Sequence, residues 1–271
     1  MMHNPEEVKE SIMKIRDLGP ISARSSAKAS LIKELFALCQ AISNGVPFNQ
    51  LRKEVLDGHI FIKNSFETRR SIWNHLKRRY LFLGDSWILR DLVKASDYGV
   101  DSIEFLSLSY LYYSLRDNLS YKLVTGPVWE KWNNKNVTIE REDLLRFLDE
   151  EARLSPQINL WYESTKKKVA NNALTSLRDF TVLSGLRRKR LQHVNAASRT
   201  VLHLLSLLTY EGLKGERLIK SSDWHLFLWS EGDVVRALNE LSNKGFVRFE
   251  KGDRSIILEI IEYPWERFKD E

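Results

Sequence analysis

The amino-acid sequence predicts a mainly helical protein that ends in a β-hairpin. Apolar residues recur at helical spacing along most of the chain, and capping residues, glycines and prolines separate the periodic segments. The pattern changes after Gly245, where residues 246–250 and 255–261 have strand-like sequences joined by Lys-Gly-Asp-Arg. We therefore expect helices first and a small antiparallel hairpin last.

The composition limits the classes of function. The 271 residues are 43% hydrophobic, which is enough for a packed core. Lys and Arg exceed Asp and Glu by 42 to 36, and this excess favours a polyanionic partner. The single cysteine, Cys39, excludes an intramolecular disulfide and fits a reducing compartment. The apolar stretches 105–115 and 201–210 are shorter than the roughly 20 residues that cross a bilayer, and residues 1–19 lack a signal-peptide core. We expect a cytoplasmic protein without membrane contact.

The N-terminal part is predicted to contain a helix-turn-helix-like unit. Residues 1–19 form an expected surface helix, and the serine-rich segment 21–30 is an expected mobile connection. A helix at 31–43 comes next. The short helix at 48–56 then leads to a longer basic helix at 64–83, as in a helix-turn-helix, although the connection is longer than the usual tight turn.

The basic helix at 64–83 carries the first candidate nucleic-acid contacts. Asn64 is expected to cap it, and its apolar side is expected to face the core. At 100° per residue Arg69 falls inside the apolar stripe, so we expect it to be paired or bound. The candidates are Arg69, Arg70, Lys77, Arg78 and Arg79.

The segment 103–115 is apolar nearly all round and is predicted to be the central helix of a bundle. It contains Tyr110, Tyr112 and Tyr113. Exposed tyrosines stack on bases, but without basic neighbours a core position is favoured here.

A later helix, which begins at Ser164, has Lys166, Lys167 and Lys168 in its first turn. The helix dipole disfavours positive charge there, and a bound anion would relieve the repulsion. These lysines are therefore candidate contacts. The alternative is a solvated lysine cluster partly compensated by Glu163.

The densest basic run, Arg187, Arg188, Lys189 and Arg190, is predicted to be a linker. It divides a helical domain at 1–186 from a C-terminal domain at 187–271. A long helix ends at Tyr210, a loop spans 214–220, and a short helix at 222–229 precedes a third helix at 230–243.

Three helices followed by the hairpin make the C-terminal domain a predicted winged helix. Such a domain usually places its third helix in the major groove and its wing against the backbone or minor groove. Its mixed charge also fits a winged helix that contacts protein. The candidate contacts are Lys220 in the loop, Arg236 and Asn239 on the third helix, and Arg248, Lys251 and Arg254 on the wing.

No catalytic constellation occurs at the required spacing. The histidines form no HExxH or other metal-ligand pattern, and the sequence has no phosphate loop, GxGxxG or GxSxG motif. The acidic run at 149–151 lies between arginines and is expected to be a solvated helix face. We expect no enzymatic activity, no metal and no cofactor.

Three stretches within residues 31–186 resemble the BrxA family, the small helical component of BREX phage-exclusion systems, also described as DUF1819. They lie at 50–83, 102–119 and 160–185. The first ends like the family's basic helix, in an Arg-Arg-Tyr or Arg-Arg-Leu motif matched by Arg78, Arg79 and Tyr80. The last resembles its Ser-Thr-x-x-Lys helix, matched by Ser164, Thr165 and Lys168.

The resemblance implies a non-enzymatic accessory protein that binds double-stranded DNA beside the system's methyltransferase, ATPase and other subunits. The family's likeness to a helical RNA-binding antitermination fold keeps RNA as a possible partner. Its older description as an inner-membrane protein finds no support in this sequence. The resemblance does not cover the region from Arg187 onward.

These observations lead to a hypothesis with alternatives. We expect a DNA-binding antiviral-defence protein held mainly by phosphate contacts. One alternative is a scaffold that docks other BREX subunits. The others are a transcriptional regulator that reads bases through Arg236 and Asn239, and an RNA-binding protein.

Overall fold

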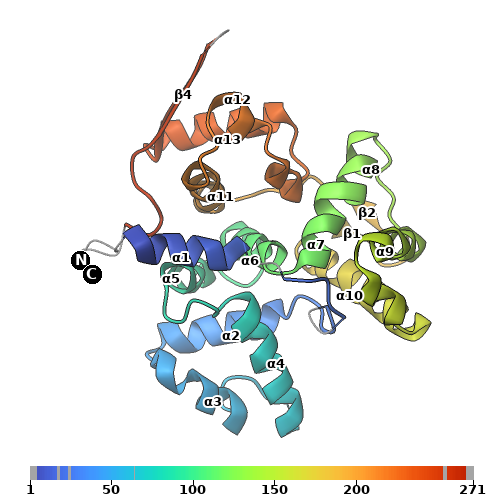
Figure 1. Cartoon of the computed structure of the whole chain (residues 1–271). Coiled ribbons are helices and arrows are strands. Elements are labelled where there is room, and N and C mark those ends of the chain that lie inside the picture. The colour runs from blue at the N-terminus through green and yellow to red at the C-terminus, as the bar shows by residue number, and fades with distance from the viewer. Residues whose placement is uncertain (1–4, 17–18, 24–25, 64, 253–254, 267–271) are drawn as a thin grey trace.

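The structure, a computed structural model, describes residues 5–16, 19–23, 26–63, 65–252 and 255–266. It is mainly helical, as predicted. Three groups of elements surround helix α6 (Ile103–Leu115), which lies near the middle of the molecule (Figure 1). Helix α1 (Pro5–Arg16) lies across this centre and contacts α6.

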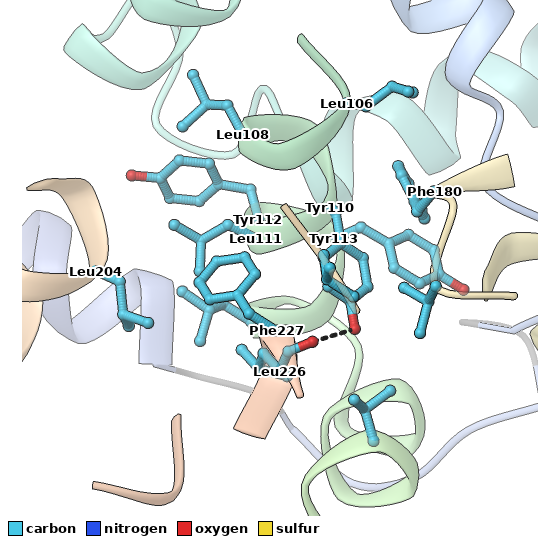
Figure 2. Close-up of a cluster of buried hydrophobic side chains, with 14 of the residues drawn as sticks. Leu106, Leu108, Tyr110, Leu111, Tyr112, Tyr113, Phe180, Leu204, Leu226 and Phe227 are labelled. Carbon is cyan, nitrogen blue, oxygen red and sulfur yellow. Dashed lines mark hydrogen bonds between the residues drawn. The ribbon is translucent and has the colours of Figure 1, made fainter. Parts of the chain in front are cut away.

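Helix α6 is buried from Phe105 to Leu115, as its uniformly apolar sequence predicts. Ser102 caps it by accepting a hydrogen bond from the backbone N–H of Phe105 at 3.2 Å. Figure 2 shows Phe180, Leu204 and Phe227, from three separate elements, gathered around it. The predicted core position of its tyrosines is confirmed, because Tyr110, Tyr112 and Tyr113 are all buried.

The first group lies at the bottom of Figure 1 and is formed by the first helices after α1. It consists of α2 (Ile32–Ser43), the 3₁₀ helix η1 (Phe48–Gln50), α3 (Leu51–Asp57), α4 (Phe66–Arg79) and α5 (Trp87–Ser96). Helices α3 and α4 pack together, and residues 58–65 connect them.

Helix α4 is shorter than the predicted 64–83. Its N-cap is Ser65, and the predicted cap Asn64 lies outside the described residues. The helix ends at Arg79 because Tyr80 leaves the helical conformation, and both Tyr80 and Leu81 are buried in the core.

The second group lies on the right of Figure 1. It consists of α7 (Asn118–Leu123), the π-helical turn η2 (Val124–Val128), α8 (Trp129–Asn133), α9 (Arg141–Leu154), η3 (Pro156–Leu160), α10 (Glu163–Asp179), β1 (Leu183–Ser184) and β2 (Arg190–Leu191).

Strands β1 and β2 form a hairpin that the sequence did not predict. Leu183 pairs with Leu191, and Ser184 pairs with Arg190. On its other side β2 is held by the segment before α9, since the Ile139 N–H donates to the Lys189 carbonyl at 3.2 Å and Thr138 bridges to Arg190. The basic run expected to be a linker is therefore the connection of a hairpin.

Gly185 shapes this connection. Its φ is +83°, and a Cβ added there would lie 2.3 Å from the Arg188 carbonyl oxygen. The close approach of residues 185 and 188 places Leu186 and Arg187 at the apex of the turn. Only glycine combines this φ with this contact.

The third group lies at the top of Figure 1. It consists of α11 (Ser198–Tyr210), α12 (Gly215–Ile219), η4 (Ser222–Phe227), α13 (Glu231–Asn243), β3 (Val247–Lys251) and β4 (Ile256–Ile260). The terminal hairpin is confirmed, with Val247 paired to Ile260 and Lys251 to Ile256. The predicted loop contains α12, and the short helix at 222–229 is 3₁₀ over most of its length.

A buried polar network joins α5, α6 and α11. The Arg199 side chain donates to both carboxylate oxygens of Asp91, at 2.8 and 2.9 Å. His203 Nε2 lies 2.6 Å from Asp91 Oδ2, and its Nδ1 lies 2.8 Å from the Tyr112 hydroxyl. Ser107 and Thr200 bond at 2.8 Å one turn away. Residues on both sides of the predicted domain boundary therefore share one core.

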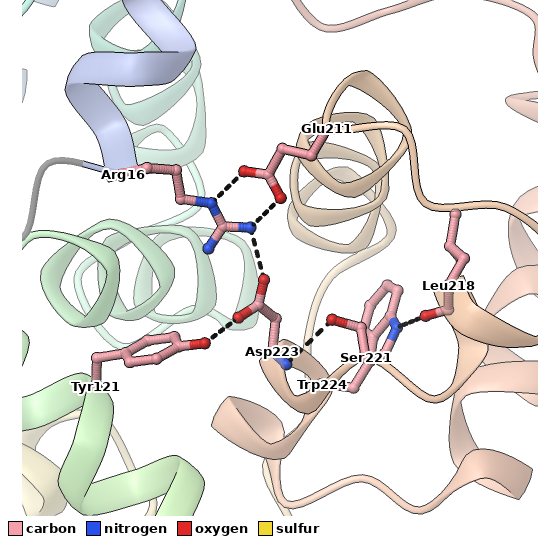
Figure 3. Close-up of polar contacts among 7 residues, drawn as sticks. All are labelled: Arg16, Tyr121, Glu211, Leu218, Ser221, Asp223 and Trp224. Atoms are coloured by element: carbon pink, nitrogen blue, oxygen red, sulfur yellow. Dashed lines mark hydrogen bonds and ion pairs between the residues drawn. The ribbon is translucent and has the colours of Figure 1, made fainter.

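A second network, shown in Figure 3, ties α1 to the second and third groups. The Arg16 guanidinium donates to Glu211 at 2.8 Å and to Asp223 at 2.6 Å. The Tyr121 hydroxyl donates to the other oxygen of Asp223. One arginine thus links the ends of α1 and α11 to α7 and η4.

The serine-rich segment expected to be mobile is packed wherever it is described. Ser26 and Ser30 are buried, and their hydroxyls donate to Asp117 at 3.2 Å and Asp179 at 2.6 Å. These contacts fix the segment against α7 and α10.

The buried His203 makes the stability of the fold dependent on pH. Burial lowers the pKa of His203 below its ordinary value of 6.5, and contact with Asp91 opposes this only in part. Below pH 6.5 the unfolded chain therefore binds more protons, and stability decreases as pH falls. We expect the free energy of unfolding to drop between pH 7 and pH 5, with a smaller drop in His203→Gln, as measured by urea titration.

The exposed His59 supplies the control for this experiment. His59→Gln also removes one histidine, but the only polar partner that its side chain loses within the described part of the chain is Glu54, 2.8 Å away on the surface. It should keep the wild-type pH dependence. An identical pH dependence in His203→Gln and the wild type would contradict the role given to burial.

The hairpin turn predicts a position-specific cost for alanine. Gly45 also has a positive φ, of +92°, but an added Cβ would meet nothing within 4 Å. We expect Gly45→Ala to lose about 1 kcal/mol of unfolding free energy from φ strain alone. Gly185→Ala should lose roughly 2–3 kcal/mol, because it adds the clash with Arg188. Equal losses in urea titrations would show that the turn relaxes freely.

Candidate nucleic-acid interface

The basic run 187–190 covers the end of the connection between β1 and β2 and the first residue of β2. Arg187, Arg188 and Arg190 are exposed, and Lys189 is half-buried. None of these four side chains forms an ion pair or hydrogen bond with the residues that the structure describes. The hairpin therefore presents four consecutive cations without an acidic partner in the described chain, which is the electrostatic arrangement that favours phosphate.

Helix α4 presents a second, partly neutralised basic surface. Arg70 pairs with Glu67 at 2.7 Å, and a guanidinium nitrogen of Arg78 lies 3.0 Å from Nδ1 of His75. Burial and the nearby charges of Arg79, Arg78 and Lys28 lower the pKa of His75 to about 3, so this imidazole is neutral. Lys77 is exposed on the same helix.

A shallow depression of about 300 Å³ runs along this face of α4. It is lined by Arg70, Arg78 and the neutral His75, together with Glu67, Ser71 and Asn74. Two guanidinium groups and several hydrogen-bonding side chains can accept a phosphate there. The Glu67 carboxylate opposes such binding.

Two of the five basic candidates on α4 are structural. The Arg69 side chain donates to the Leu56 carbonyl at 2.8 Å and to the Lys63 carbonyl, so the prediction that it is paired is confirmed. The prediction that Arg79 contacts nucleic acid is wrong. Arg79 is 1% exposed, donates to the carbonyls of Ala29 at 2.6 Å and Lys28 at 2.9 Å, and lies over the Tyr113 ring.

The three lysines at the start of α10 differ in their surroundings. Lys166 is bound to Asp149 at 2.8 Å and lies 3.8 Å from Glu163, so its charge is satisfied within the protein. Lys167 and Lys168 are exposed. They remain candidate contacts, whereas the surroundings of Lys166 match the compensated cluster that was the alternative.

The candidate cations of the C-terminal unit are mostly paired with their own neighbours. Arg236 pairs with Asp233, while Lys220 pairs with Glu216 at 2.8 Å and Arg248 with Glu250 at 3.1 Å. Lys244, the C-cap residue of α13, pairs with Glu240 at 2.6 Å. Asn239 and Lys251 are exposed, and Arg254 lies outside the described residues.

The surface beside α13 has mixed charge for the same reason. A depression of about 280 Å³ separates α13 from the segment that leads into α11, and Asp233, Arg236, Glu240 and His193 line it. Its two carboxylates outnumber its single guanidinium, that of Arg236. This surface lacks the uniform positive charge that phosphate contacts need.

The basic surfaces lie on different sides of the molecule. In Figure 1, α4 is at the bottom, β1 and β2 are at the right, and strand β4 is at the upper left. The structure thus does not gather the predicted contacts into one patch. The cations of the β1–β2 hairpin have no acidic partner among the described residues. Those of α4 are partly neutralised by nearby carboxylates, and those of the C-terminal unit are largely neutralised.

Sequence reasoning missed the parts that shape the hairpin. The Ser184-Gly185 pair is a turn signal that marks the bend. The two-residue strands and the supporting segment 137–139 have no periodic signal of their own, since pairing across a long sequence separation creates them. Leu186, at the apex, was also not identified as a candidate.

Within the described residues, no group of three or more His, Cys, Asp or Glu side chains is placed to hold a metal ion. The described helices also include none that is long and apolar enough to cross a membrane.

Comparisons with known proteins bear on the fold and the family. A structure titled "Crystal structure of an uncharacterized protein from Magnetospirillum magneticum" matches with a TM-score of 0.56 and 14% identity, covering 78% of this chain and 100% of that chain. At this identity the likeness shows the fold alone. A search of curated proteins gave no significant match.

The family comparison covers most of the chain. The BrxA family model matches residues 21–206. The match extends beyond residue 186, where the sequence resemblance ended, and includes the β1–β2 hairpin and part of α11. The chain therefore belongs to the BrxA family.

Proposed function

We propose that this protein binds duplex DNA as a non-enzymatic, cytoplasmic accessory component of a BREX-type phage-defence system. Membership of the BrxA family supports the link to BREX. The observation that carries the proposed DNA binding is the run Arg187, Arg188, Lys189 and Arg190, which has no acidic partner among the described residues.

The physical argument rests on counterion release. Each Lys or Arg that neutralises a DNA phosphate releases condensed counterions, and this term dominates sequence-independent binding. A cation that is already paired with a carboxylate contributes less binding free energy, since it must leave that carboxylate to contact a phosphate. The hairpin is therefore the strongest phosphate-binding element, with Lys77, Lys167 and Lys168 as additional exposed cations.

The C-terminal unit is proposed to be a winged helix, because α11, the short helices α12 and η4, and α13 precede the β3–β4 hairpin in chain order. Arg236 is held by Asp233 on α13, which gives little support to base reading by this helix. A sequence-specific regulator is thus less favoured than a phosphate-led binder. RNA remains the alternative nucleic acid.

A salt titration tests the proposal. Replacing Arg187, Arg188 and Lys189 by alanine removes up to three phosphate contacts. The slope of log K against log salt should then lose about two to three units on any DNA sequence, since each contact contributes roughly 0.9. Fluorescence anisotropy with unrelated duplex DNA and RNA of equal length, at several salt concentrations, measures this slope.

The paired cations of α13 provide the control. Arg236→Ala with Lys244→Ala removes two positive charges that Asp233 and Glu240 already neutralise. This variant should keep nearly the wild-type slope. If the slope fell in this control variant and stayed unchanged in the hairpin variant, DNA binding would be assigned to the winged helix. Absence of DNA binding at low salt would overturn the proposal.

A second function, contact with another protein, is favoured for the wing by a separate observation. Ile257, on β4, and Ile261, directly after it, are exposed, and strand alternation places them on one side of the hairpin with Glu259 between them. We propose that this face docks another BREX subunit. Replacing both by Ser should abolish co-purification with BREX subunits and leave DNA binding intact; unchanged co-purification would exclude this face.

A further inference from the structure

The apex of the β1–β2 hairpin carries an exposed apolar residue. Leu183 and Leu191, which pair across the two strands, are both buried at 2% exposure. Leu186, only three residues after Leu183, is 77% exposed. The Gly185 turn carries it away from the core, because the chain reverses between residues 185 and 188.

Leu186 is followed directly by the four cations of the basic run. The apex thus combines one apolar side chain with Arg187 and Arg188, while Lys189 and Arg190 continue into β2. Proteins that kink DNA use this combination: basic groups contact phosphates at the edges of the minor groove, and an apolar side chain inserts between base pairs. Phosphate binding alone would not need the leucine.

The base of the turn is well supported. The Leu191 N–H donates to the Val137 carbonyl at 2.7 Å, and the Gln192 N–H donates to the Val182 carbonyl at 2.9 Å. Backbone hydrogen bonds therefore hold β2 on both sides. A turn held by these hydrogen bonds can keep the leucine in place against a base step, whereas an unsupported loop would change conformation instead.

We propose that Leu186 is a wedge that enters the minor groove of duplex DNA, partly unstacks one base step and bends the duplex. This inference rests on the proposed function and specifies how the hairpin engages its ligand. The wedge favours steps that unstack easily, such as TA, and duplexes that a mismatch has already loosened. Insertion of the leucine bends the duplex, whereas phosphate contacts alone would leave the duplex straight.

The experiment compares Leu186→Ser with the wild type and with Leu154→Ser. Leu154 is 76% exposed at the end of α9, so the control makes the same chemical change at nearly equal exposure. A short duplex with one central TA step carries a donor and an acceptor dye at its two ends. Energy transfer reports bending, and anisotropy on the same sample reports binding.

The wild type and Leu154→Ser should raise the energy transfer and bind a centrally mismatched duplex about tenfold more tightly than the matched one, since the mismatch has already met part of the unstacking cost. Leu186→Ser should still bind, with the wild-type salt slope, but should lose both the rise in energy transfer and the mismatch preference.

The outcomes separate this proposal from the proposed function. Binding by the wild type without a rise in energy transfer, or an equal rise in Leu186→Ser, would overturn the wedge and leave DNA binding standing. An equal rise on duplex RNA would overturn the assignment to the minor groove of B-form DNA. No binding to DNA would overturn both proposals.

Discussion

Helix α6 has no solvent-facing side between Phe105 and Leu115, and the arrangement of the other elements follows from this burial. A helix that is apolar all round must be covered on every side. Most of its polar side chains also have partners, because a buried hydroxyl without a hydrogen bond is costly; among the described residues, the Ser109 hydroxyl has none. Ser107 and Tyr112 find theirs on α11, and Tyr110 donates to the Leu226 carbonyl in η4. Tyr113 donates to Ser176 on α10.

These bonds place segments from opposite halves of the sequence against one helix. The Asp91 network adds α5 to the same core, and Arg16 closes the assembly from α1. The three groups therefore act as one support for the surface elements. The β1–β2 hairpin emerges from this support with its cations free of acidic partners in the described chain, whereas Arg236 and Lys244, on α13 and at its C-cap, pair with carboxylates of that helix.

Local sequence was sufficient to predict the features that depend on local physics. Helical periodicity identified α6 and its buried tyrosines, the terminal hairpin followed from its strand-forming sequence, and the position of Arg69 within an apolar stripe required it to be paired. The features that failed depend on distant segments. The projection of α4 could not show that carbonyls of residues 28–30 would enclose Arg79. The sequence of α10 likewise could not show that Asp149 on α9 would neutralise Lys166. The charge of a side chain can be read from the sequence, but its availability depends on which residues the fold brings beside it.

The central claim is that the β1–β2 hairpin, rather than the C-terminal unit, is the main contact with DNA. Hydrogen–deuterium exchange of the whole protein, with and without saturating duplex DNA, tests this most directly because it reports every backbone amide in one experiment. The account predicts that the strongest protection on binding falls within residues 183–191. Protection confined to α13 and the β3–β4 hairpin, with exchange at the β1–β2 hairpin unchanged, would contradict it.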